Sequence, residues 1–260
     1  MSRVEGTVRS SRAKTRAFRV VAGFLGVIAF VPSAVFVLGS YTVESQDIHL
    51  VHNISGLAGF GMVFGAAGIA MAARPEDSGA AFRAVAVSAV LSLGAGLLAG
   101  DVVTGFWFVG IVFAVALYLL HPDRGDTTRV RPMWAPLLAI GVVALVVAVV
   151  YGVDQAALQR NGNPALDPHA ELHHYSGMAV MGFLLAAGAL ATATGGGGSR
   201  AIGWATGIGA ALYGAASLAY PDHLGTVDTP WAVVTLSWGL GLVTLTELGT
   251  RRSQGVRQPG

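Results

Sequence analysis

The sequence contains no cysteine and few charged residues. The absence of cysteine excludes disulfide bonds, thiolate metal sites and cysteine nucleophiles. Charged residues make up only 12% of the 260 residues, against about 25% in an average soluble domain. Hydrophobic residues make up 53%, so there is too little polar surface to cover a water-facing globule. The composition therefore predicts an integral membrane protein.

Motifs of soluble nucleotide-binding and hydrolytic enzymes are also missing. The sequence has no P-loop, no dinucleotide-binding fingerprint and no nucleophile elbow. The run of four glycines at 195–198 has no strand before it, which favours a flexible linker over a phosphate-binding loop.

Long apolar runs are abundant, and eight of them approach the roughly 20 residues that a helix needs to cross a bilayer. The predicted spans are 19–40, 50–73, 84–100, 102–120, 134–153, 172–194, 201–220 and 230–247. The third and fourth spans almost touch at Gly100 and Asp101, which predicts a tight hairpin. The predicted fold class is all-α, a polytopic membrane helix bundle with eight transmembrane helices.

Basic residues are distributed very unequally between the two sides of this predicted bundle. Of the 16 Lys and Arg residues, all except Arg160 fall on the side that holds both termini. Because basic loops stay in the cytoplasm, we expect cytoplasmic termini in a plasma-membrane protein. We interpret the basic N-terminal tail as a topology anchor that meets anionic lipid, and we expect no nucleic-acid partner.

A short pattern occurs twice in the chain, once at the start of the second predicted span and once at the start of the sixth. The pattern is His-x-x-Ser-Gly-x-Ala, at 52–58 and at 173–179. Four spans return the chain to its starting side, so the two halves are predicted to be parallel repeats related by an axis along the membrane normal. The predicted organisation is a cytoplasmic tail at 1–18, repeat 1 at 19–121, a linker at 122–133, repeat 2 at 134–248 and a tail at 249–260.

Three pairs of glycines four residues apart lie on single helix faces, at 61 and 65, 96 and 100, and 203 and 207. Such spacing lets helices approach closely. We expect these faces to meet neighbouring helices of the same chain.

The run 52–59 resembles a family of small actinobacterial membrane proteins that carry a four-helix domain of unknown function. The second helix of that family opens with His-x-x-x-His-x-x-x-Gly, a pattern that His169, His173 and Gly177 fit. In the first half the earlier histidine is His49, one residue out of register. The resemblance implies a duplicated four-helix unit and names no activity.

The same family has an aspartate near the start of its fourth helix, a position that Asp228 matches in the second half. A histidine that the family pattern places soon afterwards is missing, because Trp231 and Ala232 occupy that stretch. This departure leaves the role of Asp228 open.

Histidines are concentrated on the side opposite the termini, where six of the seven are expected, with His121 on the other side. Eight carboxylates share that outer side: Glu44, Asp47, Asp101, Asp154, Asp167, Glu171, Asp222 and Asp228. Imidazole suits zinc, copper, iron and nickel, and carboxylates can complete such a shell. The predicted metal ligands are His52, His173, His49, His169, Asp101, Asp222 and Asp228.

Several functions are compatible with this cluster. His52 and His173 occupy equivalent repeat positions, so they could face each other across the bundle as ligands of a divalent metal such as zinc or copper, or as axial ligands of a haem. The cluster could also be a set of hydrogen bonds that fastens helix ends, or part of a solute or proton pathway. The candidate functions are a metal-binding membrane enzyme or redox protein, a two-repeat transporter or channel, and a non-catalytic component that binds a lipid or a partner.

Overall fold

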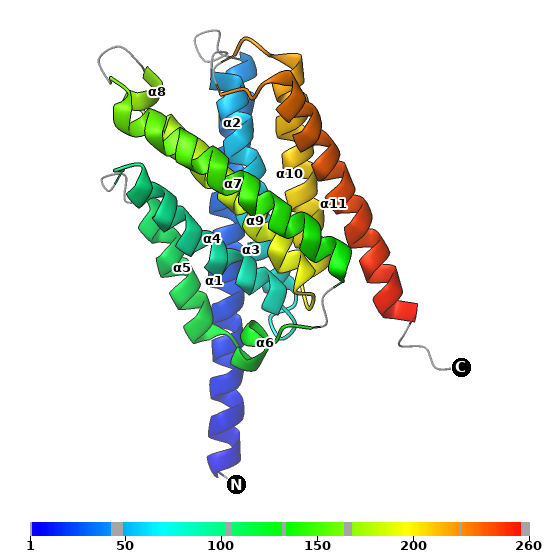
Figure 1. Cartoon of the computed structure of the whole chain (residues 1–260). Coiled ribbons are helices and arrows are strands. Elements are labelled where there is room, and N and C mark those ends of the chain that lie inside the picture. Colours follow the sequence, from blue (N-terminus) through cyan, green and yellow to red (C-terminus); the bar gives the residue numbers. More distant parts are fainter. Residues whose placement is uncertain are drawn as a thin grey trace.

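The computed structural model describes residues 2–42, 49–101, 106–131, 134–163, 168–223 and 225–255. These residues form helices joined by short turns, and none of them lies in a strand (Figure 1). The expected outer carboxylates Glu44, Asp47 and Asp167 lie outside the described residues.

The helices follow the predicted spans closely. They are α1 (Ser2–Thr42), α2 (Leu50–Gly56), the π-helix η2 (Leu57–Phe64), α3 (Gly65–Ala73), α4 (Gly79–Leu98), α5 (Phe106–Leu120), α6 (Arg124–Thr128), α7 (Ala135–Asn161), α8 (Pro168–Glu171), α9 (His174–Ala193), α10 (Ser199–Ala219) and α11 (Thr229–Gly255). The second span is one continuous rod made of α2, η2 and α3.

Seven of the described helices are long and apolar enough to cross a membrane. They are α1, the α2–η2–α3 rod, α4, α7, α9, α10 and α11. The span expected at 102–120 is represented by α5, whose apolar part, Phe108–Leu120, is shorter than the others. Residues 102–105 lie outside the described residues. The chain is thus a multi-pass helical membrane protein.

The start of α1 and the end of α11 lie at the same end of the bundle, which we call the terminal end (Figure 1). The opposite end, where α2 begins and where α8 lies, is called the histidine end. At the predicted hairpin, α4 ends with Gly100 at a left-handed φ of 70° and with the N–H of Asp101 donating back to the carbonyl of Gly96. The α4 and α5 helices on its two sides pack together, and residues 102–105 between them lie outside the described residues.

Helix packing is organised around α9, the most buried of the long helices. On the first half of the chain, α1 packs along the α2–η2–α3 rod and α4 packs on α5. On the second half, α7 packs along α9 and α10 packs on α11. Across the middle, α4 packs on α9, α10 packs on α2 and η2, and η2 meets α9.

Glycines allow several of these helices to touch backbone to backbone. A Cβ at Gly68 would lie 2.5 Å from the carbonyl oxygen of Ala22 on α1, and one at Gly209 would lie 2.5 Å from the carbonyl oxygen of Ala58 on η2. A Cβ at Gly207 would lie 2.6 Å from the carbonyl oxygen of Gly239 on α11. In the predicted pairs, Gly61 and Gly65 lie against Ser33 and Phe30 of α1, and Gly203 and Gly207 lie against Thr246 and Gly239 of α11. The expected contact with neighbouring helices of the same chain is therefore confirmed for these two pairs.

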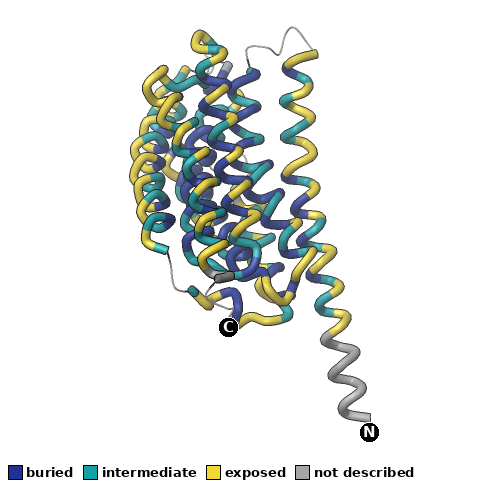
Figure 2. Tube along the Cα trace, turned by 90° about the vertical axis from the view of Figure 1, so that its right-hand side faces the viewer, coloured by how far each residue is buried: buried dark blue, intermediate teal, exposed yellow. Residues whose placement is uncertain are grey.

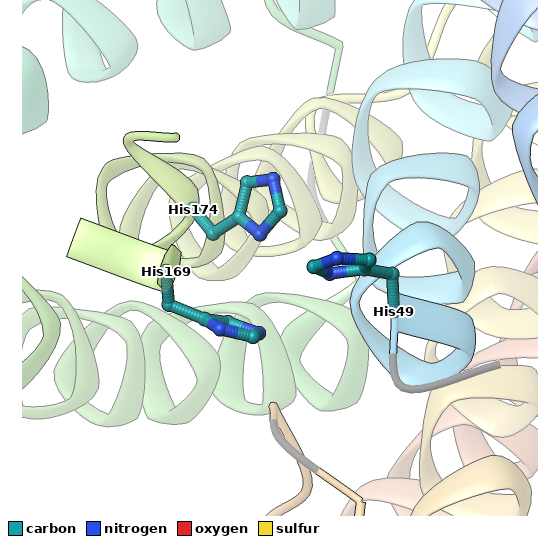
Figure 3. A group of neighbouring side chains, drawn as sticks. All are labelled: His49, His169 and His174. Atoms are coloured by element: carbon teal, nitrogen blue, oxygen red, sulfur yellow. The ribbon is translucent and has the colours of Figure 1, made fainter. Parts of the chain in front are cut away.

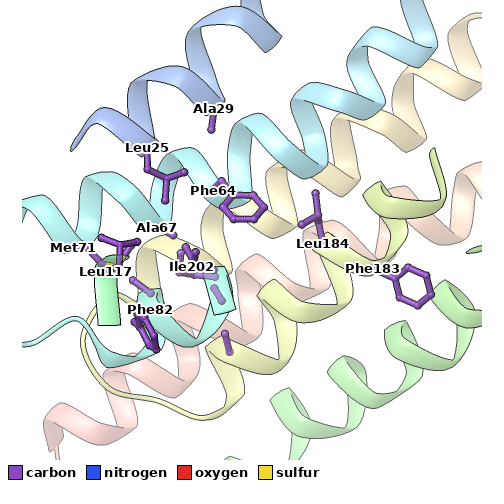
Figure 4. Close-up of a cluster of buried hydrophobic side chains, with 14 of the residues drawn as sticks. Leu25, Ala29, Phe64, Ala67, Met71, Phe82, Leu117, Phe183, Leu184 and Ile202 are labelled. Carbon is purple, nitrogen blue, oxygen red and sulfur yellow. The ribbon is translucent and has the colours of Figure 1, made fainter. Parts of the chain in front are cut away.

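The interior of the bundle is apolar and its outer surface is apolar as well. Figure 4 shows one buried cluster, in which Leu25, Phe64 and Leu184 from three different helices meet. Large apolar side chains are also exposed on the outer helices, among them Val20 and Val112 at 66% and 65% exposure (Figure 2). Exposed apolar surface of this extent fits a lipid environment.

Candidate metal centre

Three histidines converge at the histidine end (Figure 3). His49 precedes the first turn of α2, His169 lies in α8, and His174 is the first residue of α9. Each offers one ring nitrogen, and these nitrogens all lie within 4.8 Å of one another. Three imidazoles around one point are a ligand set used by catalytic zinc sites.

The three rings approach each other closely. The ring centroid of His49 lies 5.3 Å from that of His169 and 5.0 Å from that of His174. His169 and His174 are also 5.0 Å apart. His169 is only 1% exposed, so its imidazole is shielded from water.

A fourth histidine, His52, lies on the bundle side of this group. Its ring stacks on His174, with a centroid distance of 3.9 Å and an interplanar angle of 13°. In a face-to-face stack the two ring planes are parallel and in contact, so no ion can lie between them. His52 therefore packs against His174 and supports its orientation.

The turn between α8 and α9 sets which histidine enters the group. His173 adopts a left-handed backbone, with φ 59° and ψ 27°, and it is the only non-glycine residue with positive φ in the described chain. This turn directs the ring of His173 toward Asp101, with Nδ1 3.3 Å from Oδ1 of a carboxylate that is 1% exposed. His174, one residue later, points to His49 and His169 instead.

Gln159 of α7 holds the same turn from the side. Its amide nitrogen donates to the carbonyl oxygen of Ala170 at 2.8 Å, and its amide oxygen accepts from the N–H of Ser176 at 3.4 Å. Both contacts lie beside a histidine of the group, so Gln159 positions His169 and His174 without reaching their rings.

The rod that carries His49 and His52 is irregular just below them. The eight residues of η2 form a π-helix, an element that is frequent at functional sites. Gly59 lets η2 press against α9, since a Cβ there would lie 3.0 Å from the Cα of Met181. This close approach brings the first turn of α2 next to the start of α9.

Buried ring nitrogens at this end without a hydrogen-bond partner among the described residues include Nδ1 of His49, of His52 and of His223. Leaving a buried polar atom unsatisfied costs about 1–3 kcal/mol. A metal ion or another ligand bound to these nitrogens would remove that cost.

The structure brings together His49, His52 and His169 from the predicted ligand set. His173 and Asp101 form their own pair close by. Asp222 and Asp228 are exposed, and neither appears in the described contacts of the histidine rings. His223 packs on Tyr220, with ring centroids 5.0 Å apart.

His174 was not in the predicted ligand set. Helical spacing relates residues three or four apart, and His174 is five residues from His169. Only the break between α8 and α9 brings the two rings together, and the sequence gives no turn residue other than the histidine pair itself to mark that break.

The terminal end has a buried polar cluster of a different kind. Arg83 of α4 donates to the hydroxyl of Thr194, to the carbonyl oxygens of Asp126, Thr127 and Arg129, and to that of Gly195. The Asp126 carboxylate accepts from the N–H groups of Ser78 and Gly79, at 3.1 and 2.7 Å, at the start of α4.

His121 belongs to this terminal cluster. Its Nδ1 accepts from the N–H of Asp123 at 3.2 Å, which leaves Nε2 to donate to the hydroxyl of Ser78 at 3.1 Å. Burial lowers the pKa of His121 below its ordinary value. The imidazole is therefore neutral and fully hydrogen-bonded.

Comparison of the chain with protein-family models, with curated proteins and with solved structures finds no match in any of the three.

Proposed function

We propose that this chain binds one transition-metal ion, zinc or copper, through His49, His169 and His174 at the membrane boundary opposite its termini. The observation that carries the proposal is the convergence of three imidazole nitrogens within 4.8 Å, from three separate helical elements. Metal–nitrogen bonds of about 2.0–2.1 Å would draw these atoms together by small side-chain rotations.

The ligand chemistry favours a single ion over a haem. A haem takes its two axial imidazoles on opposite faces of a flat ring, whereas these three nitrogens surround one point. Three histidines also leave a fourth position for water or substrate, as in catalytic zinc sites. The proposed class is therefore a metal-dependent membrane enzyme or redox protein.

A purely structural cluster would satisfy its nitrogens with hydrogen bonds. The buried Nδ1 atoms of His49 and His52 have no such bonds within the described chain, whereas both nitrogens of His121 at the other end are bonded. This difference supports a ligand-binding role for the histidine end.

We further propose that the chain consists of two parallel four-helix repeats, with α5 as the eighth span and both termini in the cytoplasm. The packing pairs support the repeat, since α1 on the α2–η2–α3 rod corresponds to α7 on α9, and α4 on α5 corresponds to α10 on α11. The contact of α4 with α9 likewise corresponds to that of α10 with η2. The basic asymmetry of the sequence supports the orientation, and the resemblance to the actinobacterial four-helix family remains a prediction.

Metal binding is tested by equilibrium dialysis of the purified full-length chain against zinc and, separately, copper, followed by elemental analysis. We expect one ion per wild-type chain and a loss of at least about a hundredfold in affinity for His169→Ala and His174→Ala, because removing a ligand costs more than removing an outer hydrogen bond.

The matched control is His223→Ala, which removes an imidazole from the same end that packs on Tyr220. It should retain the wild-type metal content. Equal metal content in wild type, His169→Ala and His174→Ala would contradict the proposed centre.

A further inference from the structure

An apolar pocket of about 270 Å³ opens beside His52, between α1, the α2–η2–α3 rod and α9. Its walls are mostly hydrophobic and include Phe36 of α1 and Phe60 of η2. Phe36 is 60% exposed on the outer face of α1, where lipid is expected. The pocket therefore joins the lipid phase to the histidine end.

The polar groups of this pocket are few and lie in defined places. Besides His52, the lining includes Ser33 and Ser55. Both hydroxyls already donate within their own helices, to the carbonyl oxygens of Ala29 and His52. Nδ1 of His52 has no hydrogen-bond partner among the described residues.

A second polar atom at the pocket arises from a proline. Pro32 lies inside α1 and has no N–H, so the carbonyl of Ile28 lacks the helical donor that residue 32 would otherwise supply. Ile28 and Pro32 both line the pocket. Its walls thus combine aromatic rings with an unpartnered imidazole nitrogen and a carbonyl that lacks its usual helical donor.

We propose that this pocket binds a membrane-dissolved molecule with a hydroxylated aromatic head group, of the quinol class, next to the proposed metal centre. A hydroxyl can donate or accept, so it satisfies His52 in either tautomer and can donate to the Ile28 carbonyl. An aromatic head fits between the phenylalanines. His52 stacks on His174, so the bound head group lies one ring away from the metal ligands. This inference goes beyond the proposed metal-binding function, and quinol binding is measured separately from metal binding.

The test uses the full-length chain in lipid nanodiscs and a radiolabelled decyl-tailed benzoquinol as the probe. Gly56 lines the pocket and a Cβ there would meet nothing within 4 Å, so we expect Gly56→Leu to occupy pocket space without a clash at its Cβ. We expect saturable binding to the wild type and binding at least about tenfold weaker to Gly56→Leu. The control Gly94→Leu, also in open space but on α4, should bind like the wild type.

Two further arms test the head group. His52→Phe keeps a ring against His174 and removes the nitrogens, so we expect weaker quinol binding. Decanol, which has the tail and a hydroxyl but no ring, should displace the probe poorly. Displacement by decanol as effective as by unlabelled quinol would contradict the aromatic head group.

Metal content is measured on the same samples so that the two claims separate. Equal quinol binding by wild type and Gly56→Leu, with metal present in both, would overturn the pocket and leave the metal centre standing. Quinol binding that depends on Gly56 in a wild type that takes up no metal would overturn the metal centre and leave the binding pocket standing.

Discussion

The two ends of the bundle both bury polar side chains, but they satisfy them in opposite ways. At the terminal end, Arg83 donates to five acceptors and Asp126 accepts from two backbone N–H groups. At the histidine end, imidazoles are packed against imidazoles, and Nδ1 of His49 and of His52 lacks a partner within the described residues.

This difference is the basis for treating the terminal cluster as a structural joint and for proposing a binding site at the histidine end. Buried polar groups are retained at low cost when every member is hydrogen-bonded, and they are costly when some are not. The terminal cluster joins α4, α6 and the turn before α10 with complementary partners. In the histidine cluster the proposed metal ion would supply the partner that Nδ1 of His49 lacks among the described residues, and the proposed quinol would supply the one that Nδ1 of His52 lacks.

The largest expected effect on stability is at the terminal end. Arg83→Ala removes the donor shared by five acceptors, so we expect a loss of about 3 kcal/mol in unfolding free energy, since unsatisfied buried groups each carry a penalty. Thermal unfolding in detergent, followed by tryptophan fluorescence, measures this loss. Metal content should not change in the protein that remains folded.

Arg200→Ala is the matched control for that experiment. Arg200 pairs with Glu247, but its side chain is 61% exposed, and exposed ion pairs contribute little. If both arginine variants unfold at the wild-type temperature, the terminal cluster is not the joint described above.

The next largest effect is expected where the two ends are linked by close helix packing. Gly209→Ala places a Cβ 2.5 Å from the carbonyl oxygen of Ala58, so we expect a destabilisation of about 1–3 kcal/mol. Because Ala58 lies on η2 just below the histidines, metal affinity should fall as well. Gly241→Ala, which meets nothing within 4 Å, should change neither unfolding temperature nor metal affinity.

A smaller effect is expected from the side chain that holds the α8–α9 turn. Gln159→Leu removes two hydrogen bonds to the backbone beside His169 and His174. We expect metal affinity to fall by about tenfold, as for outer contacts of metal ligands. Dialysis against zinc measures this, and an unchanged affinity together with a lower unfolding temperature would show that Gln159 stabilises the fold without positioning ligands.

The smallest effect concerns pH at the terminal end. Because burial lowers the pKa of His121, the unfolded chain binds a proton more readily than the folded chain below about pH 6.5. The His121 contribution is therefore complete above that pH and is lost as the pH falls toward the folded pKa. Unfolding temperatures measured with a chelator present, from about pH 7.5 to 5, should show this decline.

His121→Gln serves as the comparison, because its amide can still reach Ser78 but does not titrate. Its unfolding temperature should fall less steeply over the same pH range. Parallel curves for the two proteins would mean that another group causes the acid sensitivity.

Much of the fold could be predicted from the sequence because lipid imposes simple requirements. The apolar runs predict the positions of the long helices, and Gly100 predicts the end of α4, where it adopts a positive φ. The glycine run at 195–198 was expected to be a flexible linker, but the carbonyl of Gly197 accepts from the N–H groups of Ala80 and Ala81. This turn is packed because three of its glycines adopt positive φ and fit against the start of α4.

The site was predictable in its location and composition but not in its detail. The distribution of histidines between the two sides of the predicted bundle puts His49, His52 and His169 at one end, and their rings lie together there in the structure. The choice of His174 depends on the left-handed turn at His173, and the position of His52 depends on the π-helix below it. Neither irregularity has a pattern in the sequence, because both arise from tertiary packing.

The most direct measurement of the central claim is X-ray absorption at the metal edge of the zinc- or copper-loaded chain. The account predicts about three imidazole nitrogens at about 2.0–2.1 Å from the ion, with the outer-ring scattering of histidine. Loss of one imidazole from the spectrum is expected in any His174→Ala protein that still carries metal. A spectrum with oxygen ligands alone, or one that is the same in His174→Ala, would contradict the three-histidine centre.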